Sequence, residues 1–362
     1  MVGSNNVSDS DKNRKKQLWW QIPLLLFLVI GTMYIVRQQR SMPYQNDNGF
    51  VFGTVYNITY QSEDNLKDEI EKELKAVDDE FSMFNEKSTV SKFNRGEQTE
   101  FSNRFWEVYD LAATVNKETK GAFDITVAPL VNAWGFGFKH ETMPTKQQVD
   151  SLRRFVGMSL LEKEESGKTL IKNGKSGKVL LKKDKRVMLD FSAIAKGYGS
   201  DCIARVLRKH GVKNFMIEIG GEVVTQGISP SRVPWRIGVT KPTDDSLQTS
   251  QQLQTVLNVT DRAMATSGNY RNFYYEGGRK YAHTIDPRTG YPVQHSLLSA
   301  TVLASDCAVA DAYATAFMVM GLERAIVLLE HHEELMAYLI YADENGDYAV
   351  WCSPQLKDSE RE

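Results

Sequence analysis

Cysteine is scarce in this chain, with only three among 362 residues, at positions 202, 307 and 352. Three cysteines permit at most one intramolecular disulfide, which excludes a disulfide-stabilised scaffold. No two of them have C-x-x-C spacing, so a zinc ribbon and a thioredoxin-type redox motif are excluded as well. The cysteine content fits an oxidising and a reducing compartment equally well.

The chain also lacks an excess of charge of one sign. Lys and Arg number 44 and Asp and Glu number 46, for a formal net charge of -2, so we expect no nucleic-acid partner. Three familiar signatures are missing: G-x-x-x-x-G-K-[ST], H-E-x-x-H and G-x-S-x-G. Their absence argues against kinase-like, zincin and α/β-hydrolase functions.

Long hydrophobic runs are absent except for one near the N-terminus. Residues 17–36 carry no charge, and about 20 apolar residues suffice to cross a bilayer core. Basic residues are denser before this run than after it, which predicts a cytoplasmic N-terminus. We therefore expect a single-pass anchor in the inner (cytoplasmic) membrane, with the rest of the chain on the periplasmic side. A cleaved signal peptide and a helix of the soluble core are the alternatives, and the signal peptide is disfavoured because no A-x-A-like site follows.

The sequence predicts one large α+β domain behind this anchor. Strand-like and helix-like segments are mixed without regular βαβ alternation, which is typical of the α+β class. The expected division is a basic tail over 1–17, the anchor over 18–36, a linker over 37–48, the domain over 49–355 and a polar tail over 356–362. We expect helices over 64–80, 103–119, 193–209, 306–320 and 322–332. We expect strands over 52–60, 213–219, 235–239, 254–259, 299–304, 335–341 and 347–352, with a meander over 168–191.

A lysine lies at a predicted helix start within DFSAIAKGY (residues 190–198). Free N–H groups at a helix start favour an anion, and Lys196 would add a point charge for phosphate. The alternative is a solvated lysine with Asp190 acting as a cap. Gly220-Gly221-Glu222, after a buried strand, indicates either a close backbone approach to a ligand or an ordinary tight turn.

Two acidic segments suggest chemistry near the C-terminal half. Asp311 and Thr315 are four residues apart and share a helix face; a carboxylate and a hydroxyl suit a hard cation such as Mg²⁺. Asp311 could instead cap a nearby loop. His283 and Asp286 could form an acid/base pair, although a lone histidine is more often structural.

These pieces, taken in order, resemble the ApbE family of FAD:protein FMN transferases. The resemblance covers about residues 50–350 and rests on seven co-ordered segments: STVSKFN (88–94), GAFDITVAPL (121–130), DFSAIAKGY (190–198), GGE (220–222), ATSGNY (265–270), HTIDPRTG (283–290) and DAYAT (311–315). Each segment alone is weak, but their shared order makes chance agreement improbable.

The resemblance implies an α+β fold of the T-fold-like ApbE type and a Mg²⁺-dependent enzyme. Such enzymes cleave FAD, release AMP and attach FMN through a phosphoester to a Ser or Thr of a target protein, typically a subunit of a redox-driven ion pump. Carried over by motif, the metal ligands are Asp311, Thr315 and the carbonyl of Ala193. The implied FAD contacts are Ala122, Phe123, Asp124, Asp190, Lys196 and Ile285, with Phe84 as an aromatic neighbour.

His283 is the implied base for the acceptor hydroxyl, with Asp286 as its candidate partner. The chain departs from the family pattern at Ala314, where some members have an acidic residue, and at Phe84, where many have tyrosine. Two other functions remain open at this point. Water could replace the acceptor, which would make the chain an FAD pyrophosphatase, or the chain could bind flavin without catalysis.

Overall fold

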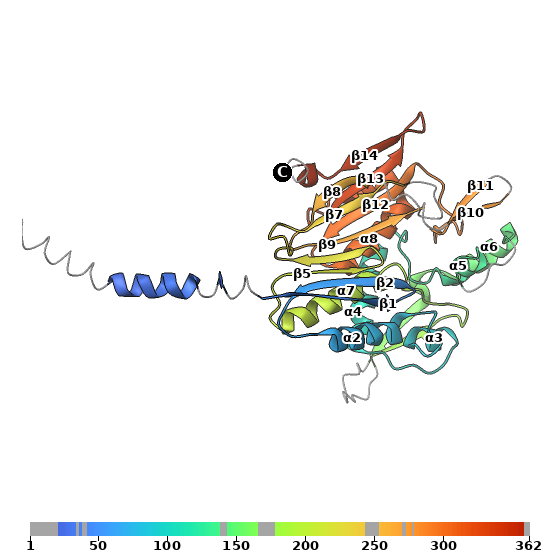
Figure 1. The fold of residues 1–362 in the computed structure, drawn as a ribbon. Coiled ribbons are helices and arrows are strands. Elements are labelled where there is room, and N and C mark those ends of the chain that lie inside the picture. The colour runs from blue at the N-terminus through green and yellow to red at the C-terminus, as the bar shows by residue number, and fades with distance from the viewer. Residues whose placement is uncertain are drawn as a thin grey trace, which may run out of the picture. The chain divides into compact units, whose positions relative to one another are not determined.

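The computed structural model describes residues 21–33, 36–37, 42–137, 143–165, 178–242, 253–269, 273–276 and 279–357. The chain divides into two compact units. One comprises Met1–Gln45 with Gln61–Asn65, and the other comprises Asn46–Tyr60 with Leu66–Glu362. The second unit holds nearly all the named elements in Figure 1.

The first unit contains an N-terminal helix. Residues 21–33 and 36–37 are helical. All of them except Arg37 lie within the run over 18–36 predicted as an anchor, and residues 18–20 and 34–35 of that run lie outside the described residues. Among the described helices, none combines the length and the hydropathy that a membrane crossing requires.

An eight-stranded sheet organises the second unit. Its order is β1-β2-β5-β6-β9-β12-β13-β14, and neighbours from β2 to β14 run antiparallel. The strands of this sheet are β1 (Tyr44–Val51), β2 (Thr54–Gln61), β5 (Phe215–Ile219), β6 (Glu222–Gln226), β9 (Ala263–Gly268), β12 (Leu297–Ala304), β13 (Met336–Ala342) and β14 (Tyr348–Cys352). Three hairpins lie outside it: β3 (Leu161–Glu165) with β4 (Lys178–Lys182), β7 (Arg236–Thr240) with β8 (Leu253–Asn258), and β10 (Phe273–Glu276) with β11 (Arg279–Ala282).

Two helices pack on the sheet and on each other. α7 (Ala195–Lys209) contacts β5 and β6, and α8 (Cys307–Met320) contacts β6, β9 and β12. α8 is almost entirely buried, as expected for a helix that is apolar all round. The remaining helices are α2 (Lys67–Phe81), α3 (Thr89–Asn94), α4 (Asn103–Glu118), α5 (Ala128–Ala133), α6 (Lys146–Leu152), α9 (Leu322–Leu329) and α10 (Pro354–Lys357), with short 3₁₀ turns at Arg153–Phe155 and Met158–Leu160.

The opposite face of the sheet is covered by the β7–β8 hairpin. Val239 and Leu257 of this hairpin share a buried cluster with Val223, Met264 and Leu303 of the sheet. Adjacent sheet residues belong to the clusters under α7 and α8 instead, because successive side chains of a strand point to opposite faces. The central strands β6, β9 and β12 are therefore largely buried on both faces.

Some predicted elements differ from the structure. The strand expected over 52–60 is the second arm of a hairpin that turns at Phe52 and Gly53, and its first arm, β1, begins at Tyr44 inside the expected linker. In the expected meander over 168–191, β4 is followed by a turn, and residues 187–190 form no strand. Those residues lie beneath other elements, with Val187 and Leu189 fully buried, so an apolar run was mistaken for a strand. The Asn173-Gly174 turn of that meander lies outside the described residues.

Candidate active site

One cavity gathers nearly all the residues predicted for the site. Its volume is about 390 Å³, within the usual range of ligand-binding clefts. Elements distant in sequence supply its walls, including the start of α7, the β5–β6 turn, β9 and α8. The predicted residues all lie in the described part of the chain, and those that line the cavity are Phe84, Ala122, Phe123, Asp124, Asp190, Ala193, Lys196, His283, Ile285, Asp311 and Thr315.

Lys196 and Glu222 form an ion pair in the cavity wall. Lys196 lies in the first turn of α7 and donates to Glu222 Oε1. Glu222 begins β6 directly after Gly220 and Gly221, whose φ angles of 62° and 101° provide the left-handed conformation that a two-residue hairpin turn requires. Burial raises the pKa of the Glu222 carboxyl; Lys196 opposes this rise, and Asp311 adds to it.

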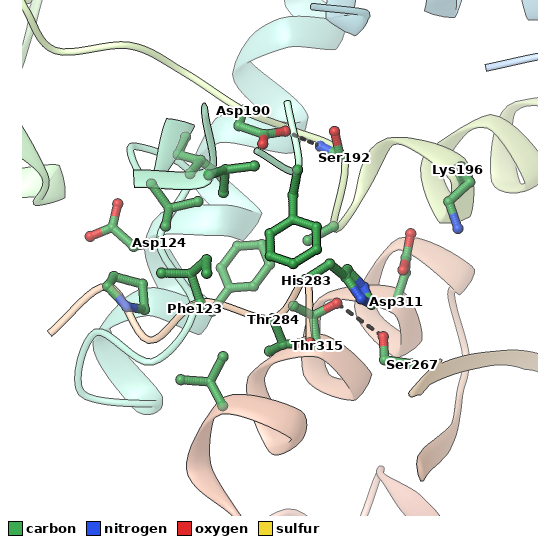
Figure 2. A pocket seen from close by; sticks show the side chains of 18 of the residues that line it. Phe123, Asp124, Asp190, Ser192, Lys196, Ser267, His283, Thr284, Asp311 and Thr315 are labelled. Carbon is green, nitrogen blue, oxygen red and sulfur yellow. Dashed lines mark hydrogen bonds between the residues drawn. The ribbon is translucent and has the colours of Figure 1, made fainter. Parts of the chain in front are cut away.

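α8 presents Asp311 and Thr315 to the same cavity. The Gly197 N–H donates to Asp311 Oδ2 at 3.1 Å, and the hydroxyl oxygens of Ser267 and Thr315 lie 3.1 Å apart (Figure 2). Asp311 is 3% exposed. Burial raises its pKa, while Lys196 and the Gly197 N–H act in the opposite direction.

A close contact between α7 and α8 sets the position of these side chains. A Cβ on Gly197 would lie 2.4 Å from the carbonyl oxygen of Cys307, so only glycine permits this approach. Asp201, one turn further along α7, accepts hydrogen bonds from the N–H groups of Cys307 at 2.8 Å and Ala308 at 2.9 Å. The N-cap residue Asp306 makes no side-chain capping bond. Asp201 therefore satisfies the first N–H groups of α8 from a neighbouring helix.

Two further carboxylates line the cavity, the half-buried Asp124 and the buried Asp190. Asp124 Oδ1 accepts from the N–H and hydroxyl of Thr126 at 2.8 and 2.6 Å, and Asn116 donates to Oδ2 at 3.2 Å. Asp190 Oδ1 accepts from the Ser192 N–H at 2.8 Å, as drawn in Figure 2. Burial raises the pKa of both carboxyls, and these hydrogen bonds oppose the rise.

His283 precedes a tight loop at the cavity wall. Ile285 and Pro292 form an isolated β-bridge across this loop, and the Asp286 carbonyl accepts from the Gly290 N–H at 2.7 Å. The imidazole meets the ring of Phe136 edge-on, with centroids 6.4 Å apart. Figure 2 shows His283 directed toward the region of Asp311 and Thr315.

Asp286 is the one predicted site residue that does not line the described cavity. Its carboxylate accepts three hydrogen bonds from Arg288, from the backbone N–H, Nε and Nη2, each at 2.9 Å. This geometry favours a role for Asp286 in closing the turn around Pro287 over the predicted partnership with His283.

Sequence reasoning did not assign a role to Glu222 or Ser267, although both lie in segments that it singled out. Glu222 lines the cavity and pairs with Lys196, and Ser267 contacts Thr315. The signal for Glu222 was an acidic residue directly after a glycine pair at the end of a buried strand. The run His331-His332-Glu333-Glu334 follows α9 and does not line the cavity, and within it His332 pairs with Glu334.

Comparison with known proteins decides the family. A model described as the ApbE family matches residues 52–340. The chain belongs to the ApbE family. An FAD:protein FMN transferase of Vibrio cholerae is 36% identical over 309 residues, covering 82% of this chain and 87% of that protein. A Haemophilus influenzae protein of the same name is 36% identical over 312 residues, covering 83% and 87%.

A solved structure shows the same fold. The flavin transferase ApbE from Vibrio cholerae superposes with a TM-score of 0.74 at 34% identity, covering 88% of this chain and all of that one. The predicted single mixed α/β domain of ApbE type is thereby confirmed. The family predicted from the seven segments is likewise confirmed.

Proposed function

We propose that this ApbE-family chain is an FAD:protein FMN transferase. Curated relatives with this name, and the flavin transferase structure that shares its fold, support FMN transfer from FAD to a target protein. The observation that carries the proposal is that a single cavity brings Lys196, His283, Asp311 and Thr315 together from separate elements. A non-catalytic flavin carrier has no need for this combination.

The chemistry assigned to the site is a phosphoryl transfer. The oxygen of a Ser or Thr hydroxyl on the target attacks the FMN phosphorus of FAD, and the bond to AMP breaks. The acceptor proton passes to the imidazole of His283, and AMP leaves as the anion. Positioning and charge stabilisation dominate such reactions, which is the task of Lys196 beside the pyrophosphate. Ala122, Phe123, Asp124, Asp190, Ile285 and Phe84 are the proposed FAD contacts.

The donor set fits a hard divalent cation such as Mg²⁺. Asp311 and Glu222 are buried carboxyl groups beside one lysine, so with both ionised a divalent cation would balance their charge. Asp311, Thr315 and the Ala193 carbonyl would hold the ion, which would neutralise charge on the phosphates. Within the described residues there is no group of three or more His, Cys, Asp or Glu suited to a metal. Mg²⁺ is commonly bound by only one or two carboxylates together with substrate phosphates.

The membrane and the partner complete the proposal. We propose that residues 18–36 anchor the chain in the inner membrane and that the domain over 49–355 faces the periplasm. The support is the uncharged run and the basic residues before it. The proposed acceptor is a Ser or Thr on a subunit of a redox-driven ion pump or a similar flavoprotein.

The decisive experiment incubates the full-length chain in detergent with FAD, Mg²⁺ and a candidate acceptor protein. We expect the acceptor to gain the mass of one FMN and AMP to appear in equal amount. FMN and AMP released without change in the acceptor would instead identify a pyrophosphatase. If neither product forms although FAD is bound, the proposal of catalysis is contradicted.

A pair of aspartates on one helix provides the control. Asp311→Ala should abolish nearly all transfer and weaken FAD binding less, and Thr315→Val should have a smaller effect because a hydroxyl carries no charge. Asp306→Ala removes the same charge from an exposed position five residues earlier that makes no capping bond. If Asp311→Ala retains as much transfer activity as Asp306→Ala and the unmodified chain, the site lies elsewhere.

A further inference from the structure

The carboxylate of Glu222 is used on one side only. Oε1 accepts from Lys196, while Oε2 is buried and has no hydrogen-bond partner among the described residues. Buried carboxylate oxygens almost always have a hydrogen-bond partner, because an unpaired one loses its hydrogen bonds to water without forming new ones. The side chain is 2% exposed and lines the same cavity as Asp311. Such an oxygen indicates a positively charged or proton-donating ligand.

The charges around Glu222 select between these ligands. Glu222 and Asp311 line the same cavity, and Lys196 lines it as well and pairs with Glu222. Two carboxylates and one ammonium leave one negative charge unbalanced in a buried environment, which is costly without a further cation. A neutral hydroxyl donor would satisfy the oxygen but not the charge.

The backbone holds Glu222 in a fixed place for such a role. The glycine turn before it is pinned, since the Gly220 N–H donates to the Val55 carbonyl at 3.0 Å. Glu222 itself pairs with Ile219 across the β5–β6 ladder. Its carboxylate is therefore presented by a central strand rather than by a mobile loop, as a preorganised ligand requires.

We propose that Glu222 is a ligand of the cation site, contributing Oε2 to the ion while Oε1 retains Lys196. This assignment rests on the proposed function, because it supposes that a divalent cation binds beside Asp311. In this assignment Glu222 contacts both positive groups proposed to face the pyrophosphate, which are Lys196 and the cation. It also gives the ion two carboxylates from separate elements, β6 and α8.

The test measures cation binding rather than turnover. Mn²⁺ serves as the probe, titrated into the full-length chain in detergent with saturating FAD and no acceptor, and free Mn²⁺ is followed by electron paramagnetic resonance. Glu222→Gln keeps the size of the side chain and an oxygen for Lys196 but removes the charge. We expect it to weaken Mn²⁺ binding by about tenfold or more, as loss of an anionic ligand does.

Glu218→Gln is the matched control. Glu218 lies on the adjacent strand, pairs with Val223 in the ladder, and its carboxylate accepts from the exposed Asn57. The substitution removes the same charge without reaching the cavity, so Mn²⁺ affinity should stay within about twofold. A similar loss in both variants would indicate a general charge effect and overturn the assignment.

Thermal unfolding supplies a second readout that a purely structural role would not produce. If Glu222 carries surplus charge for an ion, Glu222→Gln should unfold at an equal or higher temperature without Mg²⁺ and gain less from added Mg²⁺ than the unmodified chain. Unchanged Mn²⁺ affinity in Glu222→Gln, with a loss in Asp311→Ala, would overturn the role of Glu222 and leave the cation site intact. No Mn²⁺ binding by the unmodified chain would overturn both.

Discussion

His283 is the residue whose removal most directly tests the acceptor step. If its imidazole takes the hydroxyl proton, His283→Ala should slow transfer by about 10²–10⁴-fold, the usual worth of a general base. Mn²⁺ binding should persist, because the proposed ligands lie on other elements. The measurement is the single-turnover transfer rate at saturating FAD. A near-normal rate with weakened FAD binding would show that His283 only contacts the flavin.

Asp286 offers a contrasting case three residues further on. Its carboxylate is fully engaged by Arg288, and this pairing raises the pKa of the guanidinium. Asp286→Asn should lower the free energy of unfolding by about 1–2 kcal/mol, since hydrogen bonds to a charged partner are lost. The transfer rate of the folded enzyme should change by less than about threefold. Chemical denaturation and the same single-turnover assay separate the two effects, and a large rate loss with unchanged stability would restore an orienting role.

At the scale of the element, the first N–H groups of α8 are bound by the carboxylate of Asp201 on α7. Burial raises the pKa of Asp201 to about 7; the hydrogen bonds from Ala308 and Cys307 lower it, while Asp306 raises it and Arg205 lowers it through charge. A carboxyl with a raised folded pKa holds its proton more tightly when folded than when unfolded. Its contribution to stability is complete below about pH 4 and is lost as the pH rises to about 7.

Asp201→Asn should remove this contribution to the pH dependence. The free energy of unfolding of the unmodified chain, relative to Asp201→Asn, should fall between about pH 4 and pH 7. Urea denaturation at several pH values measures the slope. A flat difference for Asp201→Asn would mean that the carboxyl titrates alike in the folded and unfolded chain.

Elements with a clear period were predictable, and elements formed by distant pairing were not. The helix expected over 103–119 is α4 (Asn103–Glu118), because its apolar residues recur at helical spacing and Ser102 caps its start. β6 and β9 were not predicted as strands, although both lie in segments noted for their chemistry. β9 (AMATSG) consists of small and polar residues and owes its strand conformation to pairing with β6 and β12, whereas β6 (EVVTQ) contains β-branched residues whose strand signal was overlooked. Tertiary context decides such segments.

At the scale of the whole molecule, the order of the seven segments predicted better than any single segment which residues would line one cavity. Lys196, His283 and Asp311 are separated by dozens of residues in the sequence, yet they line one cavity. The resemblance supplied this convergence, since local spacing carries no information about which strands are neighbours. The involvement of Glu222 required the structure, because its unpaired oxygen is visible only when the surrounding atoms are placed.

The proposed membrane anchor and its orientation can be tested at this scale. A periplasm-specific reporter fused after Glu362 should be active, and a cytoplasm-specific reporter at the same place should be inactive, because the basic residues before the uncharged run retain the N-terminus inside. Deleting residues 1–36 should abolish the periplasmic signal. Activity of the cytoplasmic reporter on the full chain would reverse the proposed orientation.

The pairing of β2 with β5 has a consequence for biosynthesis. Tyr56 of β2 pairs with Ile219 of β5. During synthesis, β2 therefore cannot pair with β5 until about 160 further residues have been made. At a synthesis rate of about 5–20 residues per second, that delay is about 8–30 s. Closing so long a loop is also slow, since non-local pairing retards folding. The nascent chain therefore lacks its central sheet until β5 has been made, and until then β2 has no partner strand on that side.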